Sequence, residues 1–286
     1  MMHARLNETI TERLGRPAES CRALGGGCVG EVYRVRMKDG GDLVVKYDSC
    51  ASPALDVEGY MLRYLAEHSA LPVPRVLHSS PDLLAMECVD GESRFDAAAQ
   101  RHAAELLAAL HSVRAPRFGL DRATLIGGLP QPNPWADSWV AFFRGQRLLH
   151  MADMALEERV MPAALHRRIR GFAERLGDFI GEPEHPSLLH GDVWTTNVLA
   201  RNGRITAFID PAVYYGHPEI ELAFITLFNT FGTPFFDAYR ALRPIAPGFF
   251  EQRRDIYNLY PLLVHTRLFG ASYLSGVEQT LAKLGF

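Results

Sequence analysis

The stretch His190-Gly191-Asp192-Val193-Trp194-Thr195-Thr196-Asn197, followed by Ile209-Asp210, decides how the rest of the chain is interpreted. Short apolar runs at 188–189 and 198–200 border it, which predicts a loop joined to short strands, where functional side chains are often held. Asp192 can accept the proton of a hydroxyl nucleophile, while Asn197 and Asp210 supply the oxygen ligands that magnesium prefers. Asp and Asn are also common turn formers, so the loop alone leaves a purely structural interpretation open.

A glycine-rich segment lies far upstream, between two runs of β-type residues. Its sequence fits G-x-G-x-x-G-x-V, and because a β run follows the glycines where a Rossmann turn would open a helix, it predicts a hairpin. Glycines let backbone amides approach phosphate oxygens without a clash at Cβ. The residues expected to contact a nucleotide here are Gly25, Gly26, Gly27, Cys28, Val29, Gly30 and Val32. Glycine-rich turns are common, so an ordinary turn stays open as well.

A lysine and a glutamate follow the hairpin in the order found at kinase nucleotide sites. Lys46 is the one cation of an otherwise apolar strand at 43–47, and such a lysine can pair with the α- and β-phosphates of ATP. Glu58 lies beside the apolar stripe of a helix expected at 53–67, from which it can reach Lys46 and fix its position. A solvated edge lysine and a surface acid are the alternatives, and the pairing favours the nucleotide site.

The pattern then changes from β to helical, which indicates two lobes. Strands are expected at 73–78 and 83–88, and the segment Met86, Glu87, Cys88 and Val89 would connect the lobes and hold adenine through backbone groups. We therefore expect an α+β fold with an N-terminal nucleotide-binding lobe at 1–88, built from an antiparallel sheet and one main helix. The larger, mostly helical lobe at 89–286 would carry the catalytic loop and the acceptor site.

The segment after Asp210 is short, because only about ten residues separate it from a helix expected at 219–229. A protein kinase needs a longer activation segment here to dock peptide substrates, so the spacing favours a small molecule or an exposed adduct as acceptor. Glu221 at the start of that helix suits the positive end of the helix dipole and can also brace the catalytic loop.

Composition excludes several other classes of protein. The chain has 286 residues, 48% of them hydrophobic, and a net charge of −3, which gives no electrostatic footprint for nucleic acid. No apolar run approaches the roughly 20 residues that span a bilayer, and the first residues lack the apolar core of a signal peptide. Four cysteines show neither a disulfide framework nor zinc spacing, so we expect a reducing cytoplasm and no membrane partner.

These motifs, in this order, resemble the aminoglycoside phosphotransferase/choline kinase branch of the protein-kinase-like fold. The narrower resemblance is to the fructosamine kinase, or ketosamine-3-kinase, family. It is carried over nearly the whole chain by Pro130-Gln131-x-Asn133, Trp139-Val140-x-Phe142-Phe143 with Arg147, the 190–197 loop, Ile209-Asp210-Pro211-Ala212-Val213-Tyr214-Tyr215-Gly216-His217, and Leu259-Tyr260-Pro261-Leu262-Leu263-Val264-His265.

The resemblance implies ATP- and Mg²⁺-dependent phosphorylation of the sugar 3-hydroxyl of a ketosamine, the adduct of a sugar with a lysine amine. The unstable product frees the amine, which is a protein deglycation or repair role. Ribulosamines and erythrulosamines are implied as better acceptors than fructosamines. Two alternatives stay open: a kinase for an aminoglycoside or choline-like amine, and a nucleotide-binding pseudokinase. The protein would be a monomer or weak homodimer, and Cys28 lies where many relatives carry a redox-linked cysteine.

The acceptor site is predicted from single residues rather than from a complete motif. Trp194, two positions beyond the expected base Asp192, would border the sugar. The remaining candidates for contact with the acceptor are His217, Glu219, Asn133, Trp135 and His265.

Overall fold

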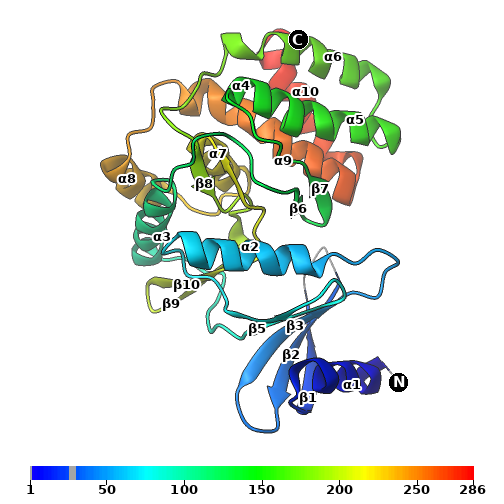
Figure 1. Cartoon of the computed structure of the whole chain (residues 1–286). Helices are drawn as coiled ribbons and strands as arrows, with labels where there is room; N and C mark the ends of the chain where they lie inside the picture. The colour runs from blue at the N-terminus through cyan, green and yellow to red at the C-terminus, as the bar shows by residue number, and fades with distance from the viewer. Residues whose placement is uncertain (1, 26–29) are drawn as a thin grey trace.

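The computed structural model describes residues 2–25 and 30–286, and it has the two lobes expected from the sequence (Figure 1). The smaller lobe is built on one five-stranded antiparallel sheet with the strand order β1-β2-β3-β5-β4. Its strands are β1 (Ala18–Leu24), β2 (Glu31–Met37), β3 (Asp42–Tyr47), β4 (Val76–Ser79) and β5 (Leu83–Glu87). The predicted fold class, α+β with a kinase-like arrangement, is confirmed.

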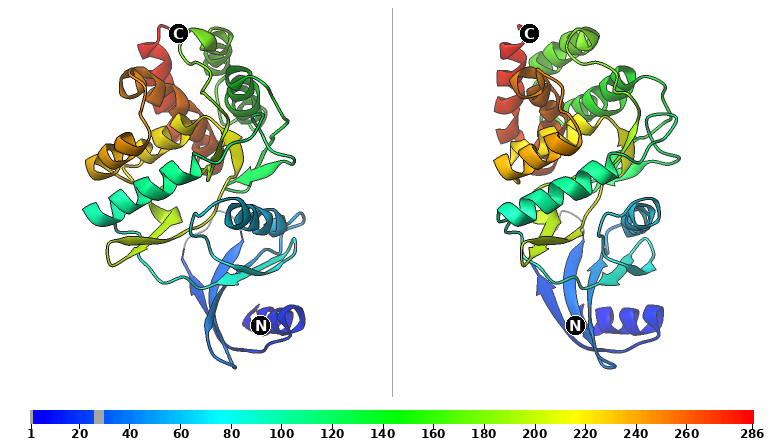
Figure 2. Two further views of the ribbon diagram at one scale, coloured as in Figure 1. Left: turned by 60° about the vertical axis from the view of Figure 1, so that its left-hand side comes forward. Right: turned by 90° about the vertical axis from the view of Figure 1, so that its left-hand side faces the viewer.

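Two helices accompany this sheet. Helix α1 (Met2–Leu14) is amphipathic, and its Leu6 and Ile10 pack with Val35 and Val45 of the sheet in one buried cluster. Helix α2 (Leu55–His68) lies between the sheet and the larger lobe (Figures 1 and 2). One face of α2 packs on β5, while its other apolar residues enter the core of the larger lobe. Helix α2 therefore contacts both lobes.

The larger lobe is mainly helical. Its helices are α3 (Ala97–Leu110), α4 (Trp139–Phe142), α5 (His150–Glu157), α6 (Ala163–Glu174), α7 (Pro218–Leu227), α8 (Thr233–Leu242), α9 (Arg254–Phe269) and α10 (Leu274–Lys283). Single π-helical segments join α4 to α5 (Phe143–Leu149) and lead into α9 (Phe249–Arg253), and 3₁₀ turns cover Leu176–Asp178, Thr195–Asn197 and Ala271–Tyr273. Helix α9 is buried along most of its length, which makes it the centre of this lobe.

Three short antiparallel pairs of strands position the loops between these helices. β8 (Ser187–Leu189) pairs with β11 (Tyr214–Gly216), and β9 (Val198–Arg201) pairs with β10 (Arg204–Phe208). β6 (Thr124–Ile126) pairs with β7 (Leu129–Gln131). The strands predicted on either side of the 190–197 loop are thus confirmed. β6, β7 and β11 were not anticipated, because three residues are too few to show a strand period. Within the described residues, no helix has the length and apolar character needed to cross a membrane.

Candidate active site

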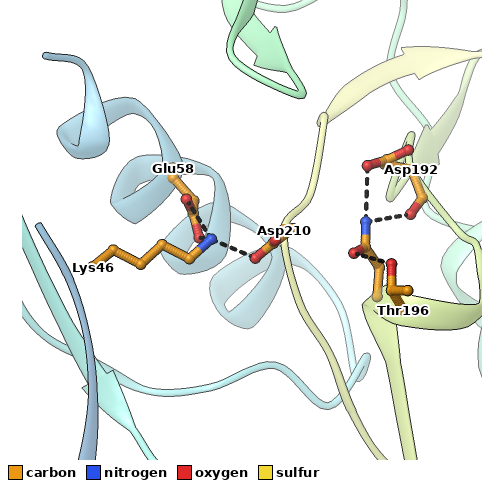
Figure 3. A network of polar contacts seen from close by, with 6 residues as sticks. Lys46, Glu58, Asp192, Thr196 and Asp210 are labelled. Carbon is orange, nitrogen blue, oxygen red and sulfur yellow. Dashed lines mark hydrogen bonds and ion pairs between the residues drawn. The ribbon is translucent and has the colours of Figure 1, made fainter. Parts of the chain in front are cut away.

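Three charged side chains from different parts of the chain meet where the lobes face each other (Figure 3). Lys46 Nζ lies 2.8 Å and 3.0 Å from the two carboxylate oxygens of Glu58, so the predicted pair is present. The same Nζ donates to Asp210 Oδ1 at 2.6 Å. A strand, a helix and the segment after β10 are therefore joined at one ammonium group.

Burial sets the electrostatics of this group. Lys46 is only 6% exposed, and burial alone would lower its pKa, but the carboxylates of Glu58 and Asp210 outweigh that effect and raise the pKa. Burial also raises the pKa of Glu58, which Lys46 partly opposes. Lys46 thus stays cationic in an enclosed position, as a lysine that receives phosphate oxygens must.

Only some of the predicted nucleotide contacts next to Lys46 lie within the residues that the structure describes. Val32 of β2 lies opposite Lys46 of β3 in the sheet register. Gly30 has φ +67°, and a Cβ there would lie 2.7 Å from the Tyr47 carbonyl oxygen, so the end of the hairpin requires glycine. Gly25 precedes the gap, whereas Gly26, Gly27, Cys28 and Val29 lie outside the described residues.

The predicted connection between the lobes begins at the end of β5. Met86 is buried and lies opposite Val44, Glu87 is exposed, and Cys88 and Val89 are half-buried. Met86 and Glu87 pair with β3, the strand that carries Lys46, while Cys88 and Val89 follow the last residue of β5.

The catalytic loop candidate is held by its own polar groups. Asn197 donates through Nδ2 to Asp192 Oδ2 at 2.8 Å and to the Asp192 carbonyl oxygen at 3.1 Å. The backbone carbonyl of Asn197 accepts from Ile209 N at 2.9 Å, which fixes the loop relative to Asp210. Gly191 has φ +87° and a Cβ would lie 2.1 Å from the Ala212 carbonyl oxygen, so another residue would displace this packing.

Asp210 has a left-handed backbone, with φ +54°. Such a conformation costs about 1 kcal/mol for most residues, although Asp and Asn tolerate it best. The turn directs the carboxylate back toward Lys46, as Figure 3 shows. Strained backbone at a predicted ligand supports a functional role for this residue.

The set of side chains around Asp192 suits a divalent cation. Burial raises the pKa of Asp192 well above its usual range, and the negative charges of Asp210 and Glu221 raise it further, while the bond from Asn197 opposes them. A cation would offset this excess of negative charge, and Asp210 and the amide oxygen of Asn197 are hard oxygen donors. Among the described residues no group of three His, Cys, Asp or Glu side chains forms a metal cluster, so the donors would be these two residues and non-protein oxygens.

A buried carboxylate braces the loop from behind. Glu221 Oε1 accepts from the backbone N–H of Gly191 at 2.6 Å. Glu221 Oε2 lies 2.8 Å from His111 Nε2, and His111 Nδ1 lies 2.7 Å from the Tyr239 hydroxyl. The bracing expected of Glu221 is present, whereas its buried partner His111, from the end of α3, was not predicted.

Asp192 also lines a cavity. Its walls come from β6, β11, α7 and α9, and its lining residues are Ile126, Gly191, Asp192, Tyr214, Ile220, Glu221, Phe224, Tyr260, Pro261, Val264 and His265. The lining residues are mainly apolar and aromatic, and the acidic ones are Asp192 and Glu221. Its volume of about 20 Å³ has room for roughly one water molecule, so it can take a single hydroxyl group beside Asp192 and not a whole sugar.

Two of the predicted acceptor contacts, His265 and Trp194, lie at or near this cavity. His265 lines it. Trp194 packs against His265, with ring centres 6.2 Å apart, and against Phe228 at 5.5 Å. Trp135 is 39% exposed and lies outside α4, with its ring 6.5 Å from that of Tyr215. Successive side chains of a strand point to opposite faces, so the Tyr215 side chain that Trp135 meets faces away from Tyr214, which lines the cavity.

The other three acceptor candidates have hydrogen-bond partners within the fold and are not among the residues that line this cavity. Asn133 is buried, donates to Thr124 Oγ1 and accepts from Arg147 Nη2 at 2.6 Å. Both oxygens of Glu219 accept from Arg253, at 2.6 Å and 2.7 Å. His217 caps the N-terminus of α7, where its Nδ1 accepts from the Glu219 N–H at 3.0 Å.

His217 gives the fold an expected acid sensitivity. Its burial, together with the positive charge of Arg253, lowers its pKa to about 3. An unfolded histidine binds a proton near pH 6.5, so stability is complete above that pH and falls as the pH drops toward the folded pKa, by about 2 kcal/mol at pH 5. His217→Asn keeps a capping acceptor. Denaturant titrations at pH 7 and pH 5 should therefore show a smaller pH effect in this variant, and an unchanged effect would contradict the assignment.

Known proteins are similar in sequence to this chain over nearly its whole length. A model of the fructosamine kinase family matches residues 2–285. A Synechocystis protein provisionally named ketoamine kinase is 30% identical over 285 residues, which cover 96% of this chain and 94% of that protein. The chloroplastic protein-ribulosamine 3-kinase of Oryza sativa subsp. indica is 31% identical over 275 residues, covering 93% and 79% respectively.

Solved structures agree with this similarity. A crystal structure from Thermobifida fusca, provisionally named fructosamine-3-kinase, matches with a TM-score of 0.85 and 33% identity over 97% of both chains. An aminoglycoside phosphotransferase matches with a TM-score of 0.68 and 21% identity over 97% of this chain and 98% of its own, which shows the shared fold alone. The same phosphotransferase was also crystallised with AMP-PNP and hygromycin B.

Proposed function

This chain belongs to the fructosamine kinase family, and we propose that it transfers the γ-phosphoryl group of ATP to the sugar 3-hydroxyl of ketosamines. The observation that carries the proposal is the position of Asp192. Its carboxylate accepts from Asn197 on one side and lines a small apolar cavity on the other, close to the Lys46–Asp210 ion pair. A hydroxyl in that cavity would lie between a base and the phosphate site.

ATP would bind between the lobes. The glycine-rich hairpin and Lys46 would contact the phosphates, and Glu58 would keep Lys46 in place after its bond to Asp210 gives way to phosphate oxygens. The connection from Met86 to Val89 would hold adenine through backbone groups. The two carboxylates on Lys46 support this role, since they keep the lysine charged although it is buried.

Asn197 and Asp210 would hold magnesium, which neutralises charge on the phosphate oxygens when bound. The excess of negative charge around Asp192 supports this assignment. The protein's own contribution is positional: Asn197 orients the Asp192 carboxylate, and its carbonyl fixes the segment that leads to Asp210.

Asp192 would act as the base of the transfer. The acceptor oxygen forms a bond to the γ-phosphorus, the bond from that phosphorus to the β-phosphate oxygen breaks, and ADP leaves. The hydroxyl proton passes to the Asp192 carboxylate. The product is the ketosamine 3-phosphate, whose decomposition frees the amine.

The acceptor class follows from the relatives, whose names specify ketoamines and protein-bound ribulosamine. We expect ribulosamine and erythrulosamine adducts of lysine to be preferred, with Trp194 and His265 beside the sugar. Action as a monomer or weak homodimer in the cytoplasm stays a prediction.

An acceptor panel tests the function. With Mg·ATP, ADP release should be fastest with ribulose-lysine and erythrulose-lysine, slower with fructose-lysine, and at background with kanamycin and choline. The same catalytic groups would act on each of these acceptors, so the protein can distinguish them only through contacts in the acceptor cavity. Phosphorylation of kanamycin without any ketosamine turnover would replace the proposal with an aminoglycoside kinase, and no turnover with any acceptor would favour a pseudokinase.

A further inference from the structure

Helix α2, which carries Glu58, makes polar and aromatic contacts with the larger lobe that the proposed chemistry does not use. Tyr60 and Tyr64 lie one helical turn apart, so they face the same neighbour. The residues that they meet come from the loop before β6 and from β11. Figure 1 shows α2 lying against this part of the larger lobe.

Tyr60 is held at its hydroxyl and on its ring. Its hydroxyl donates to Asp121 Oδ1 at 2.9 Å. The guanidinium carbon of Arg122 lies 4.0 Å from the centre of the Tyr60 ring, which is a cation–π arrangement. Two consecutive residues of the larger lobe thus fix one tyrosine from two directions.

Tyr64 makes the second contact. Its hydroxyl donates to the hydroxyl of Tyr215 at 3.2 Å, and the two rings meet edge to face with centres 6.4 Å apart. His68 stacks on the other side of Tyr64 at 4.0 Å. Tyr215 also exchanges two backbone hydrogen bonds with Gly119, each 2.9 Å long. The surfaces that receive Tyr60 and Tyr64 are therefore joined to each other.

The chain on both sides of Asp210 touches α2 or the linker that follows it. Before Asp210, the Phe208 N–H donates to the carbonyl of Pro72 in that linker at 2.8 Å. After Asp210, Tyr215 meets Tyr64. Met61 and Leu65 of α2 are buried in the core of the larger lobe. The helix that supplies Glu58 is thus tied to the segment that supplies Asp210, and both carboxylates meet at Lys46.

A change in the position of α2 would be costly. It would withdraw Glu58 from a buried ammonium group and leave that charge with one partner fewer. In protein kinases the corresponding helix is positioned through the activation segment. Here only residues 211–217 separate Asp210 from α7, which is too short for such a segment.

We propose that Tyr60, Tyr64 and Tyr215 are positioning residues that hold α2, and with it Glu58, in the orientation that meets Lys46. The proposal rests on the nucleotide role proposed for Lys46 and Glu58.

The test removes the hydroxyls and keeps the rings. In the full chain carrying both Tyr60→Phe and Tyr64→Phe, amide hydrogens of α2 should exchange about tenfold faster, because two hydrogen bonds that hold the helix are lost. The affinity for Mg·ATP, measured by calorimetry, should fall about tenfold, while the KM for a ketosamine stays within twofold. Tyr64→Phe and Tyr215→Phe remove the same hydrogen bond. Each single variant should therefore change α2 exchange and Mg·ATP affinity nearly as much as the variant that carries both substitutions.

Tyr257→Phe is the matched control, because its hydroxyl accepts from Trp139 Nε1 inside the larger lobe, in contact with α4 rather than α2. It should lower thermal stability to a similar extent and leave α2 exchange and Mg·ATP affinity unchanged. If the paired variant behaves like this control, or if α2 exchanges faster with no loss of Mg·ATP affinity, the positioning role is wrong. Calorimetry needs no acceptor, so this result is independent of whether ketosamines prove to be the substrate.

Discussion

Asp192→Asn is expected to lower turnover of the preferred ketosamine by roughly 100- to 10,000-fold, which is the usual contribution of a general base. The amide has the shape of the carboxylate but cannot accept the hydroxyl proton during transfer. It also removes a charge that Asp210 and Glu221 disfavour, so the fold should lose little stability. Single-turnover measurements with saturating Mg·ATP and acceptor give the rate, and calorimetry gives the affinity for Mg·ATP, which should stay within a few fold.

Two comparisons sharpen this result. Asn197→Ala removes the donor that orients Asp192 and also the proposed metal ligand, so it should reduce both turnover and Mg·ATP affinity. Asp178→Asn, in an exposed ion pair with Arg175, changes the same type of side chain far from the site and should have no effect on either. Near-normal turnover in Asp192→Asn would remove Asp192 from the role of base.

The sequence predicted the parts of the site whose residues must lie a fixed, short distance apart along the chain in order to interact. Asp192 and Asn197 share one loop, and their hydrogen bond needs the short separation that the motif supplies. Lys46 is conspicuous as a cation in an apolar strand, and Glu58 lies on the next helix. The bond between Lys46 and Asp210, which are 164 positions apart, leaves no local pattern in the sequence and was not predicted.

The acceptor side could not be predicted in the same way, because polarity in a sequence does not reveal what a side chain faces. Asn133 meets the buried guanidinium of Arg147, and Glu219 meets Arg253, so both satisfy charges inside the fold. The cavity wall is instead made of ordinary apolar residues, such as Ile126 and Val264, that tertiary packing brings together. His111 and Glu221 are 110 positions apart, so no local pattern could indicate that they are partners.

Asp210→Ala is expected to abolish most of the magnesium dependence of nucleotide binding. If Asp210 holds the metal, its loss removes a close charge pair, an effect of roughly 2–5 kcal/mol, so Mg·ATP should bind at least about 30-fold more weakly. Lys46 keeps Glu58 as a partner, so the buried ammonium is not left unpaired. In EDTA the effect on affinity should be the opposite. Asp210→Ala should then bind ATP more tightly than the unmodified chain, because the carboxylate that repels the phosphates is gone. Calorimetry with ATP in magnesium and in EDTA measures both effects.

The backbone at this position requires a second variant. Alanine is strained at φ +54°, whereas asparagine tolerates this conformation, so Asp210→Asn separates loss of charge from distortion of the turn. The asparagine variant should show the same reversal in EDTA with a smaller loss of thermal stability. Asp39→Ala, which breaks an exposed pair with Arg16 in the smaller lobe, is the control for a lost carboxylate. If both Asp210 variants bind ATP in magnesium as the unmodified chain does, Asp210 is not a metal ligand, and its bond to Lys46 is then its main role.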